Sequence, residues 1–253
     1  GGRWLLRMED IDPPREPLSR ASSGCCFGGG RLWYFGGGHY SWKGNDVELY
    51  DPRINEWHRA TEPEWPREGT AAWKSLTSGS DGTKELSPSR RPYTEHTFQQ
   101  VCWDPKAGKF VAVLRWSGTW EFDPGKAVWT RLVATAPSGG KLPYAHISSS
   151  LAVYDPALEA PVLILTAKKS PGVFFLERSP RGARWNRLGD TPADLLDARL
   201  YATYVPKWTG HLVSCRRRDG SRWFDLSFVT LRAVKIKEGE GPPPCSALAY
   251  DSL

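Results

Sequence analysis

The sequence predicts an all-β protein built from a repeated unit of four short strands. The chain has 253 residues, among them 13 Trp, 25 Gly and 21 Pro. Trp favours strands, whereas Gly and Pro favour turns, so this balance predicts many short strands. A hydrophobic strand that ends in an aromatic residue and a turn also recurs at regular spacing. Four antiparallel strands per repeat are the unit of a β-propeller blade.

The first strand of each repeat carries the clearest pattern. It reads "TFQQVCWDP", "SSSLAVYDP", "LYATYVP" and "SALAYDS", with reference positions at Asp104, Asp155, Val205 and Asp251. These positions are separated by 51, 50 and 46 residues. Such a constant period indicates consecutive copies of one structural unit.

The other three strands of each repeat follow in a fixed order. A second apolar run lies at 109–114, 161–166 and 211–215, and a third strand begins near Gly118, Gly172 and Gly220. The fourth strand carries Trp129 or Trp185. Residues 28–57 supply an earlier copy, in which Asp51 precedes Trp57 by the same spacing as Asp123 precedes Trp129; Asp225 and Leu231 keep this spacing without the Trp. The predicted blades cover 24–62, 93–137, 138–192 and 193–241.

The earliest copy resembles the kelch motif. An apolar strand, "LWYF", runs into Gly36, Gly37 and Gly38, and "NDVELYDP" and Trp57 follow. The resemblance implies positive φ at these glycines and implies that Tyr50 and Trp57 fill space between blades. As architecture it covers residues 24–253, although the later blades carry "RWSG", "KKSPG" and "RRRDG" in place of the double glycine. Galactose oxidase-like proteins share this fold.

Two further segments complete the predicted propeller. Residues 63–92 are rich in Pro, Gly, Ser and charge and are predicted to form a long loop inserted between the first two blades. Residues 242–253, "PPPCSALAYDSL", begin a fifth blade and supply one strand of it. A closed propeller hides its sheet edges by coming full circle. Four blades plus one strand therefore favour a fragment of a larger ring over a closed four-bladed ring.

The N-terminal stretch "WLLRMEDIDPPRE" resembles glutamyl-Q tRNA(Asp) synthetase. The motif residues are Arg7, Glu9, Asp10 and Asp12, followed by Pro13, Pro14 and Arg15. The resemblance implies that Glu9 would hold the amino group of glutamate, but the nucleotide-binding motifs of that family are missing. We therefore predict that residues 1–16 are an orphan segment and 17–23 a junction. Both are expected to lie outside the propeller of residues 24–253, so that deleting residues 1–20 would leave stability nearly unchanged.

Composition narrows the classes of function. The net charge of +6 permits an acidic partner without indicating nucleic acid. No apolar run approaches membrane-spanning length, and no signal peptide is visible. The five Cys form no C-x-x-C pair, which favours reduced structural thiols and the cytoplasm. We expect no cofactor, no metal site and no catalytic residue.

The strand order predicts where a partner would bind. Loops between the first and second and between the third and fourth strands lie on one side of a blade, the turn face, which collects the Asp-Pro turns. Loops between the second and third strands lie on the other, here named the 2–3 loop face. The candidate binding residues on that face are His39, Trp42, Lys43, Arg115, Trp116, Lys168, Lys169, Arg216, Arg217 and Arg218. Cations with exposed aromatic rings suit an acidic protein or glycan.

The sequence leaves three classes of function open. The first is a non-enzymatic binding scaffold that uses the 2–3 loop face. The second is a galactose oxidase-like or carbohydrate-active enzyme, because that family binds copper with Tyr and His, and His96 and His146 hold near-equivalent positions beside Tyr93 and Tyr144. The third is the synthetase suggested by residues 1–16. The same equivalence follows from repetition alone, so we favour the scaffold.

Overall fold

The computed structural model describes residues 20, 22–37, 42, 44–64, 69–70, 73–74, 87, 89–92, 96–115, 117–134, 150–208, 210–217 and 220–239. For residues 207, 217 and 237–239 only the backbone is described. The predicted fifth-blade strand and residues 1–19 lie outside this part of the chain. None of its helices is long and apolar enough to cross a membrane.

The described residues form an all-β propeller with four antiparallel sheets of four strands each. In blade one the strands are β1 (Gly24–Gly28), β2 (Arg31–Phe35), β3 (Glu48–Asp51) and β4 (Glu56–Arg59); in blade two β5 (Val101–Asp104), β6 (Lys109–Leu114), β7 (Gly118–Asp123) and β8 (Val128–Val133). Blade three holds β9 (Ser150–Asp155), β10 (Ala160–Leu165), β11 (Gly172–Ser179) and β12 (Gly182–Gly189), and blade four β13 (Arg199–Val205), β14 (Gly210–Arg217), β15 (Gly220–Ser227) and β16 (Arg232–Gly239). Short 3₁₀ helices η3 (Ala193–Leu195) and η4 (Pro206–Trp208) flank β13. The predicted order and number of strands are confirmed.

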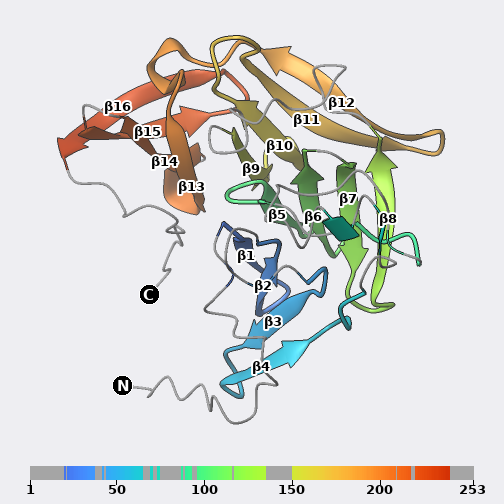
Figure 1. The fold of residues 1–253 in the computed structure, drawn as a ribbon. Helices are drawn as coiled ribbons and strands as arrows, with labels where there is room; N and C mark the ends of the chain where they lie inside the picture. The colour runs from blue at the N-terminus through green and yellow to red at the C-terminus, as the bar shows by residue number, and fades with distance from the viewer. Residues whose placement is uncertain are drawn as a thin grey trace.

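The four blades are arranged around a common centre (Figure 1). The first strands β1, β5, β9 and β13 lie innermost, and the fourth strands lie at the perimeter. Neighbouring inner strands contact one another from β1 to β5, from β5 to β9 and from β9 to β13. Blades one and four are the two ends of this arc, with a gap between their ribbons in Figure 1.

Aspartate side chains shape the turns between strands, as the sequence predicts. The Asp104 carboxylate accepts hydrogen bonds from the backbone N–H groups of Lys106 and Ala107, at 3.0 and 3.1 Å. Asp51, Asp123 and Asp155 accept equivalent bonds in their own turns. The residue before the next strand then adopts a positive φ, as at Asn55, Ala127 and Glu159. This turn pattern is local backbone chemistry.

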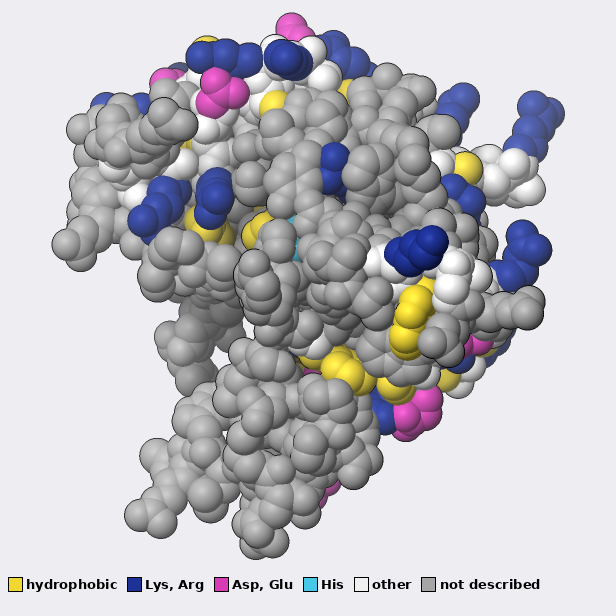
Figure 2. All heavy atoms as spheres, viewed as in Figure 1, with side chains coloured by type: hydrophobic (Ala, Val, Ile, Leu, Met, Phe, Trp, Pro, Cys, Tyr) yellow, Lys and Arg dark blue, Asp and Glu magenta, His cyan; other side chains and the backbone are white. Residues whose placement is uncertain are grey.

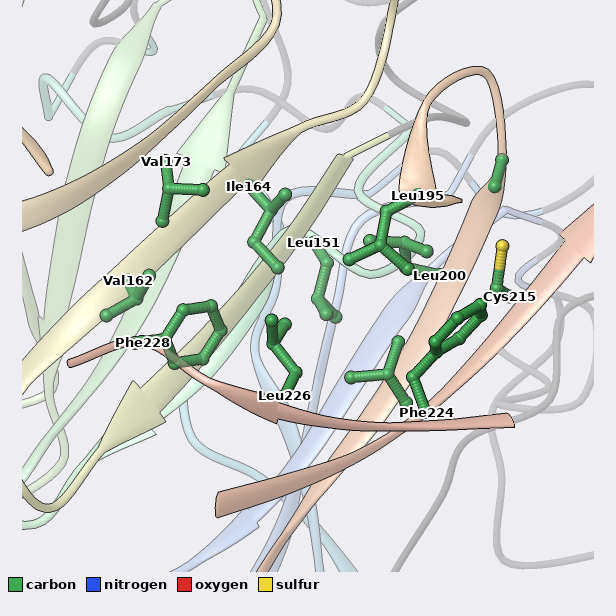
Figure 3. Packing of buried hydrophobic residues seen from close by; sticks show 12 residues of the cluster. Leu151, Val162, Ile164, Val173, Leu195, Leu200, Cys215, Phe224, Leu226 and Phe228 are labelled. Atoms are coloured by element: carbon green, nitrogen blue, oxygen red, sulfur yellow. The ribbon is translucent and has the colours of Figure 1, made fainter. Parts of the chain in front are cut away.

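Blades two, three and four each pack one face of their sheet on the blade before them. Between blades one and two, Trp33 and Phe35 pack with Phe122 and Trp129 in one buried cluster. Between blades two and three the cluster includes Cys102, Ala152 and Leu163. Figure 3 shows the interface of blades three and four, where Leu151, Val162, Ile164 and Val173 meet Leu195, Leu200, Cys215, Phe224, Leu226 and Phe228. The hydrophobic core is thus a series of sheet-to-sheet interfaces.

The repeated tryptophans occupy matching faces of their blades. Trp57 pairs with Tyr50, and Trp129 pairs with Phe122, each one residue pair away from the turn. Trp185 pairs with Leu176, two pairs further from its turn, because the hairpin of blade three is longer. An even shift keeps the side chain on the same face. In blade four Ser227 begins the turn and Leu231 lies within it, so Asp225 and Leu231 are not the equivalents of Asp51 and Trp57.

Two of the three glycines that follow β2 adopt the positive φ that was predicted for them. Gly36 and Gly37 adopt φ values of 98° and 137°. A Cβ atom at Gly37 would lie 2.6 Å from the Trp42 carbonyl oxygen. Gly38 lies outside the described residues. Within the predicted 63–92 loop, residues 73–74 are helical.

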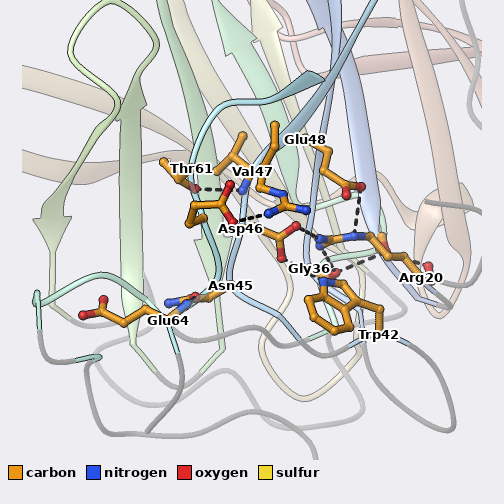
Figure 4. A network of polar contacts seen from close by, with 12 residues as sticks. Arg20, Gly36, Trp42, Asn45, Asp46, Val47, Glu48, Thr61 and Glu64 are labelled. Atoms are coloured by element: carbon orange, nitrogen blue, oxygen red, sulfur yellow. Dashed lines mark hydrogen bonds and ion pairs between the residues drawn. The ribbon is translucent and has the colours of Figure 1, made fainter. Parts of the chain in front are cut away.

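The segment before β1 contains a buried arginine. The Arg20 Nη2 atom lies 2.6 Å from Asp46 Oδ2, and its Nε atom lies 3.3 Å from Glu48 Oε2. Its Nη1 group donates a hydrogen bond to the Gly36 carbonyl at 3.0 Å. Figure 4 shows these contacts at the centre of the loop between β2 and β3. The propeller therefore begins at least four residues before the predicted boundary at residue 24, and a deletion that reaches residue 20 would remove this ion pair.

Polar groups also join neighbouring blades near the turns. His211 Nε2 lies 3.0 Å from Asp155 Oδ2, and the histidine side chain is fully buried. Tyr204 and Phe228 pack edge-on against its ring. One blade earlier, Arg178 Nη1 lies 2.5 Å from Asp104 Oδ2. Each aspartate thus bonds its own turn with one oxygen and the following blade with the other.

We expect the Asp155 carboxylate to make stability depend on pH. Burial raises the pKa of Asp155, but hydrogen bonds with His211 and the Leu158 N–H outweigh this, and the pKa lies below its ordinary value. Such a group stabilises the fold above its unfolded-state pKa, and this contribution is lost as pH falls through the folded-state pKa. The difference in Tm between the chain and Asp155→Asn should therefore be constant near neutral pH and shrink below about pH 4.

Thermal denaturation at a series of pH values checks this expectation. Asp190→Asn is the matched control, because the Asp190 side chain is 86% exposed. Its difference in Tm from the parent chain should remain small throughout. A difference for Asp155→Asn that does not change with acidification would contradict the role of this carboxylate.

Candidate functional site

The described residues that line the centre of the propeller form a small hollow on the 2–3 loop face. It is bounded by Ser23, Phe98, Gln99, Ser150, Arg199, Leu200 and Tyr201 and has a volume of about 20 Å³, room for about one water molecule. These residues come from the beginning of all four inner strands or from the residues just before them. The connections between blades enter the inner strands at this side. The hollow is therefore where the central channel opens on the 2–3 loop face.

Polar side chains and one cation line this opening. Ser23 Oγ donates to the Arg20 carbonyl at 2.6 Å, and Gln100 Nε2 donates to Ser150 Oγ just behind the wall. Arg199 is exposed at the first position of β13. Sequence reasoning missed Arg199, because an arginine at the start of a strand carries no signal of its own. Arg199 lies at the centre of the propeller because β13 is the innermost strand of its blade, and this position exists only when the blades are assembled.

Four predicted cations lie on the same face, three of them in loops and one near the end of a strand. Arg115 follows β6 and is partly buried, and Lys168 and Lys169 are exposed in the loop between β10 and β11. Arg216 lies near the end of β14 and is partly buried. The Lys168 Nζ atom lies 3.0 Å from Asp197 Oδ2, so its charge is partly balanced. Arg and Lys side chains appear in Figure 2 as separate groups and not as one continuous patch in that view.

Trp42 does not have the exposed position that the sequence predicted. Its side chain is only 9% exposed, and its Nε1 group donates to Asp46 Oδ1 at 2.8 Å. Asp46 is in turn paired with Arg20. The ring holds the loop between β2 and β3 in place, so it is unavailable for stacking on a ligand.

The remaining predicted residues are not placed. His39, Lys43, Trp116 and Arg218 lie outside the described residues, and for Arg217 only the backbone is described, paired with Gly220 at the end of β14. The synthetase-like residues of the 1–16 segment also lie outside. The predictions for these positions stay predictions.

The histidine considered for copper is a core residue. His96 is 2% exposed, and its ring meets Phe98 edge-on with centroids 5.5 Å apart. Its proposed equivalent, His146, and the tyrosines at 93 and 144 lie outside the described residues. Within the described part of the chain, no group of three or more His, Cys, Asp or Glu side chains is placed to hold a metal ion.

Comparisons with known proteins found similar structures but no related sequence. No protein-family model matches the chain, and no curated protein matches its sequence. Among solved structures, it is similar to TolB from Acinetobacter baumannii with a TM-score of 0.47 and 10% identity over 85% of this chain and 43% of that chain. It is similar to an engineered GH43 glycoside hydrolase with a TM-score of 0.44 and 11% identity over 92% of this chain and 44% of that chain. The chain thus spans less than half the length of either structure.

Proposed function

We propose that this chain is a non-enzymatic binding scaffold whose 2–3 loop face takes an acidic protein surface or an acidic glycan. The observation that carries this proposal is that Arg115, Lys168, Lys169 and Arg216 all lie in loops or at a strand end on one face. Arg199 adds a further exposed cation where the central channel opens on that face. Cations on separate loops can contact anionic groups at several points of an extended ligand.

Both faces carry exposed cations, and they differ in how their carboxylates are engaged and in the hollow at the centre of the 2–3 loop face. On the turn face the Asp104 and Asp155 carboxylates accept hydrogen bonds from their own turns and pair with the next blade. These groups are engaged within the fold. On the 2–3 loop face, Lys169 is exposed and the hollow supplies polar side chains at the centre. We infer that a ligand would rest over the channel opening and reach outward to the loops.

Charge reversal at the end of β14 tests the proposal. We expect a variant with Arg216→Glu, Arg217→Glu and Arg218→Glu to bind an acidic probe at least about tenfold more weakly, because charge-assisted hydrogen bonds contribute roughly 1.5–3 kcal/mol each. Heparin serves as the glycan probe and poly-glutamate as the protein-like probe. The readout is the dissociation constant at fixed ionic strength, since such binding depends on salt.

A matched variant on the turn face is the control. Arg53, Lys106 and Lys126 are exposed there, and reversing all three changes the net charge by the same amount. This control variant should keep the affinity of the parent chain for the probe, because its three substitutions lie on the turn face and leave the proposed binding face unchanged. Equal losses in both variants would show that net charge alone attracts the probe and would count against a binding face.

A further inference from the structure

Blade one has a sheet face that no other described blade covers. Trp33, Phe35 and Leu49 point toward blade two in the shared cluster. Alternation along the strands therefore directs Cys25, Phe27, Leu32, Tyr34 and Tyr50 to the opposite side. Phe27 is 62% exposed, the second highest value among the exposed large hydrophobic side chains of the described residues. In blades two to four the corresponding face packs on the preceding blade.

The inner strands share an aromatic residue that shows what this face requires. Phe27, Trp103, Tyr154 and Tyr204 each occupy the pair next to the last before the first turn of their blades. Trp103 stacks on Trp33 of the preceding blade, with centroids 5.7 Å apart and planes at 6°. Phe27 occupies the same position in blade one. Trp33 lies on the second strand of blade one, but the Trp103 ring also lies against Gly28, the last residue of the inner strand β1. By analogy, Phe27 would rest on the last residue of an inner strand seated between β13 and β1.

The chain itself supplies a segment with the pattern of an inner strand. Residues 246–251 read "SALAYD", whereas β9 reads "SLAVYD". The match places Tyr250 at the position of Tyr154 and Ala249 at the position of Cys102. The segment is short of polar residues between Ser246 and Asp251, as expected for a strand covered on both faces.

The end of β16 lies at the right place to deliver this segment. Gly239 pairs with Ser221 at the 2–3 loop face, the side at which every inner strand begins. Residues 240–244 connect it to Cys245. From Gly239 to Ser246 the chain has seven Cα-to-Cα steps, which at about 3.3 Å each reach up to about 23 Å. The path crosses three strand spacings, roughly 14 Å, and the roughly 10 Å between packed sheets, which is roughly 17 Å in a straight line. Blade four and blade one are also the two ends of the arc in Figure 1.

We propose that residues 246–251 form the inner strand of a fifth blade position, seated between β13 and β1, with Ala249 facing Cys25 and the strand end against Phe27. The register follows from the interface of blades two and three, where Cys102 and Ala152 share a buried cluster. Ala249 takes the place of Cys102, and Cys25 takes the place of Ala152. Leu248 then points the other way, toward blade four.

Thiol cross-linking in the full-length chain tests this register. In a Cys245→Ser background, Ala249→Cys should be joined to native Cys25 by a short bismaleimide, and fragmentation of the tryptic peptides identifies the linked residues. Cys25 is a free and partly exposed thiol. Leu248→Cys is the matched control and should link at least about tenfold less, because neighbouring side chains of a strand point to opposite faces. Equal yields for the two variants, or no link in either, would overturn the proposal.

Two further measurements show whether residues 246–251 of the same chain or a second copy of the chain cover blade one. A link between two chains, detected as a covalent dimer, would show that a second copy covers blade one and would overturn the docking of residues 246–251. Deletion of residues 245–253 gives an independent readout, the rate at which Cys25 is alkylated. We expect that rate to rise at least about tenfold when the covering strand is removed. An unchanged alkylation rate would show that residues 245–253 do not cover Cys25 and would overturn the proposal.

Discussion

Replacement of Arg20 by alanine is expected to lower the free energy of unfolding by about 3–5 kcal/mol, because removing one partner of a buried ion pair leaves the other charge uncompensated. The Arg20 and Asp46 side chains are both fully buried, and that of Glu48 is 8% exposed. Asp46 also accepts the Trp42 indole bond. Loss of the guanidinium would therefore disturb the whole loop between β2 and β3. Chemical denaturation monitored by tryptophan fluorescence measures the effect.

Arg53→Ala is the control for this experiment. Arg53 also pairs with a carboxylate, Asp51, but its side chain is 67% exposed. Water screens an exposed pair, so this variant should unfold at nearly the same denaturant concentration as the parent chain. If Arg20→Ala lost as little stability as Arg53→Ala, the buried network would not hold the loop. The prediction from sequence that a deletion through residue 20 is harmless would then stand.

Gly28→Ala is expected to destabilise the interface between blades one and two by about 1–3 kcal/mol, the usual cost of overpacking a core. A Cβ atom at Gly28 would lie 1.8 Å from Trp103 Cγ. Trp103 cannot simply move away, because it is stacked on Trp33. The Trp33 Nε1 group in turn donates to the Gly28 carbonyl at 2.9 Å. The measurement is again the free energy of unfolding.

A double-mutant cycle isolates the clash. In a Trp103→Ala background the added methyl group has space, so Gly28→Ala should there cost less than about 1 kcal/mol. Gly125→Ala is a second control, because its Cβ would approach only the Asp123 carboxylate, at 3.4 Å. Additive effects of Gly28→Ala and Trp103→Ala would show that the glycine is required for a reason other than the approach of the ring.

The blade organisation was predictable because its signals are local. Side chains alternate along each strand, and the Asp-containing turns end the strands at regular intervals, so Asp51, Asp104, Asp123 and Asp155 mark hairpins that the structure confirms. In blade four the same reasoning misplaced the turn at Asp225. There Ser227 takes the role of the aspartate, and its hydroxyl accepts a weaker bond from Thr230 N–H at 3.4 Å.

The candidate site could be predicted only in part. Strand order alone places Arg115, Lys168, Lys169 and Arg216 on one face, since antiparallel strands return to the same side at every second turn. Arg199 escaped notice because its place at the channel opening depends on the assembled blades. The sequence predicted an exposed Trp42 ring, but Trp42 donates to Asp46, and Asp46 pairs with the buried Arg20. Arg20 precedes β1 whereas Asp46 follows β2, so no local pattern in the sequence shows this contact.

The amino-acid sequence by itself determined the number and order of the described strands and the chemistry of the turns that begin with aspartate, because these depend on residues that are neighbours in the chain. Only the tertiary structure decided which charges are buried, which aromatic rings are covered and where the propeller begins. Burial of Arg20 and exposure of Phe27 both result from packing between segments that come together through the arrangement of the blades. Side-chain environment is a property of that arrangement, and no local pattern of residues specifies it.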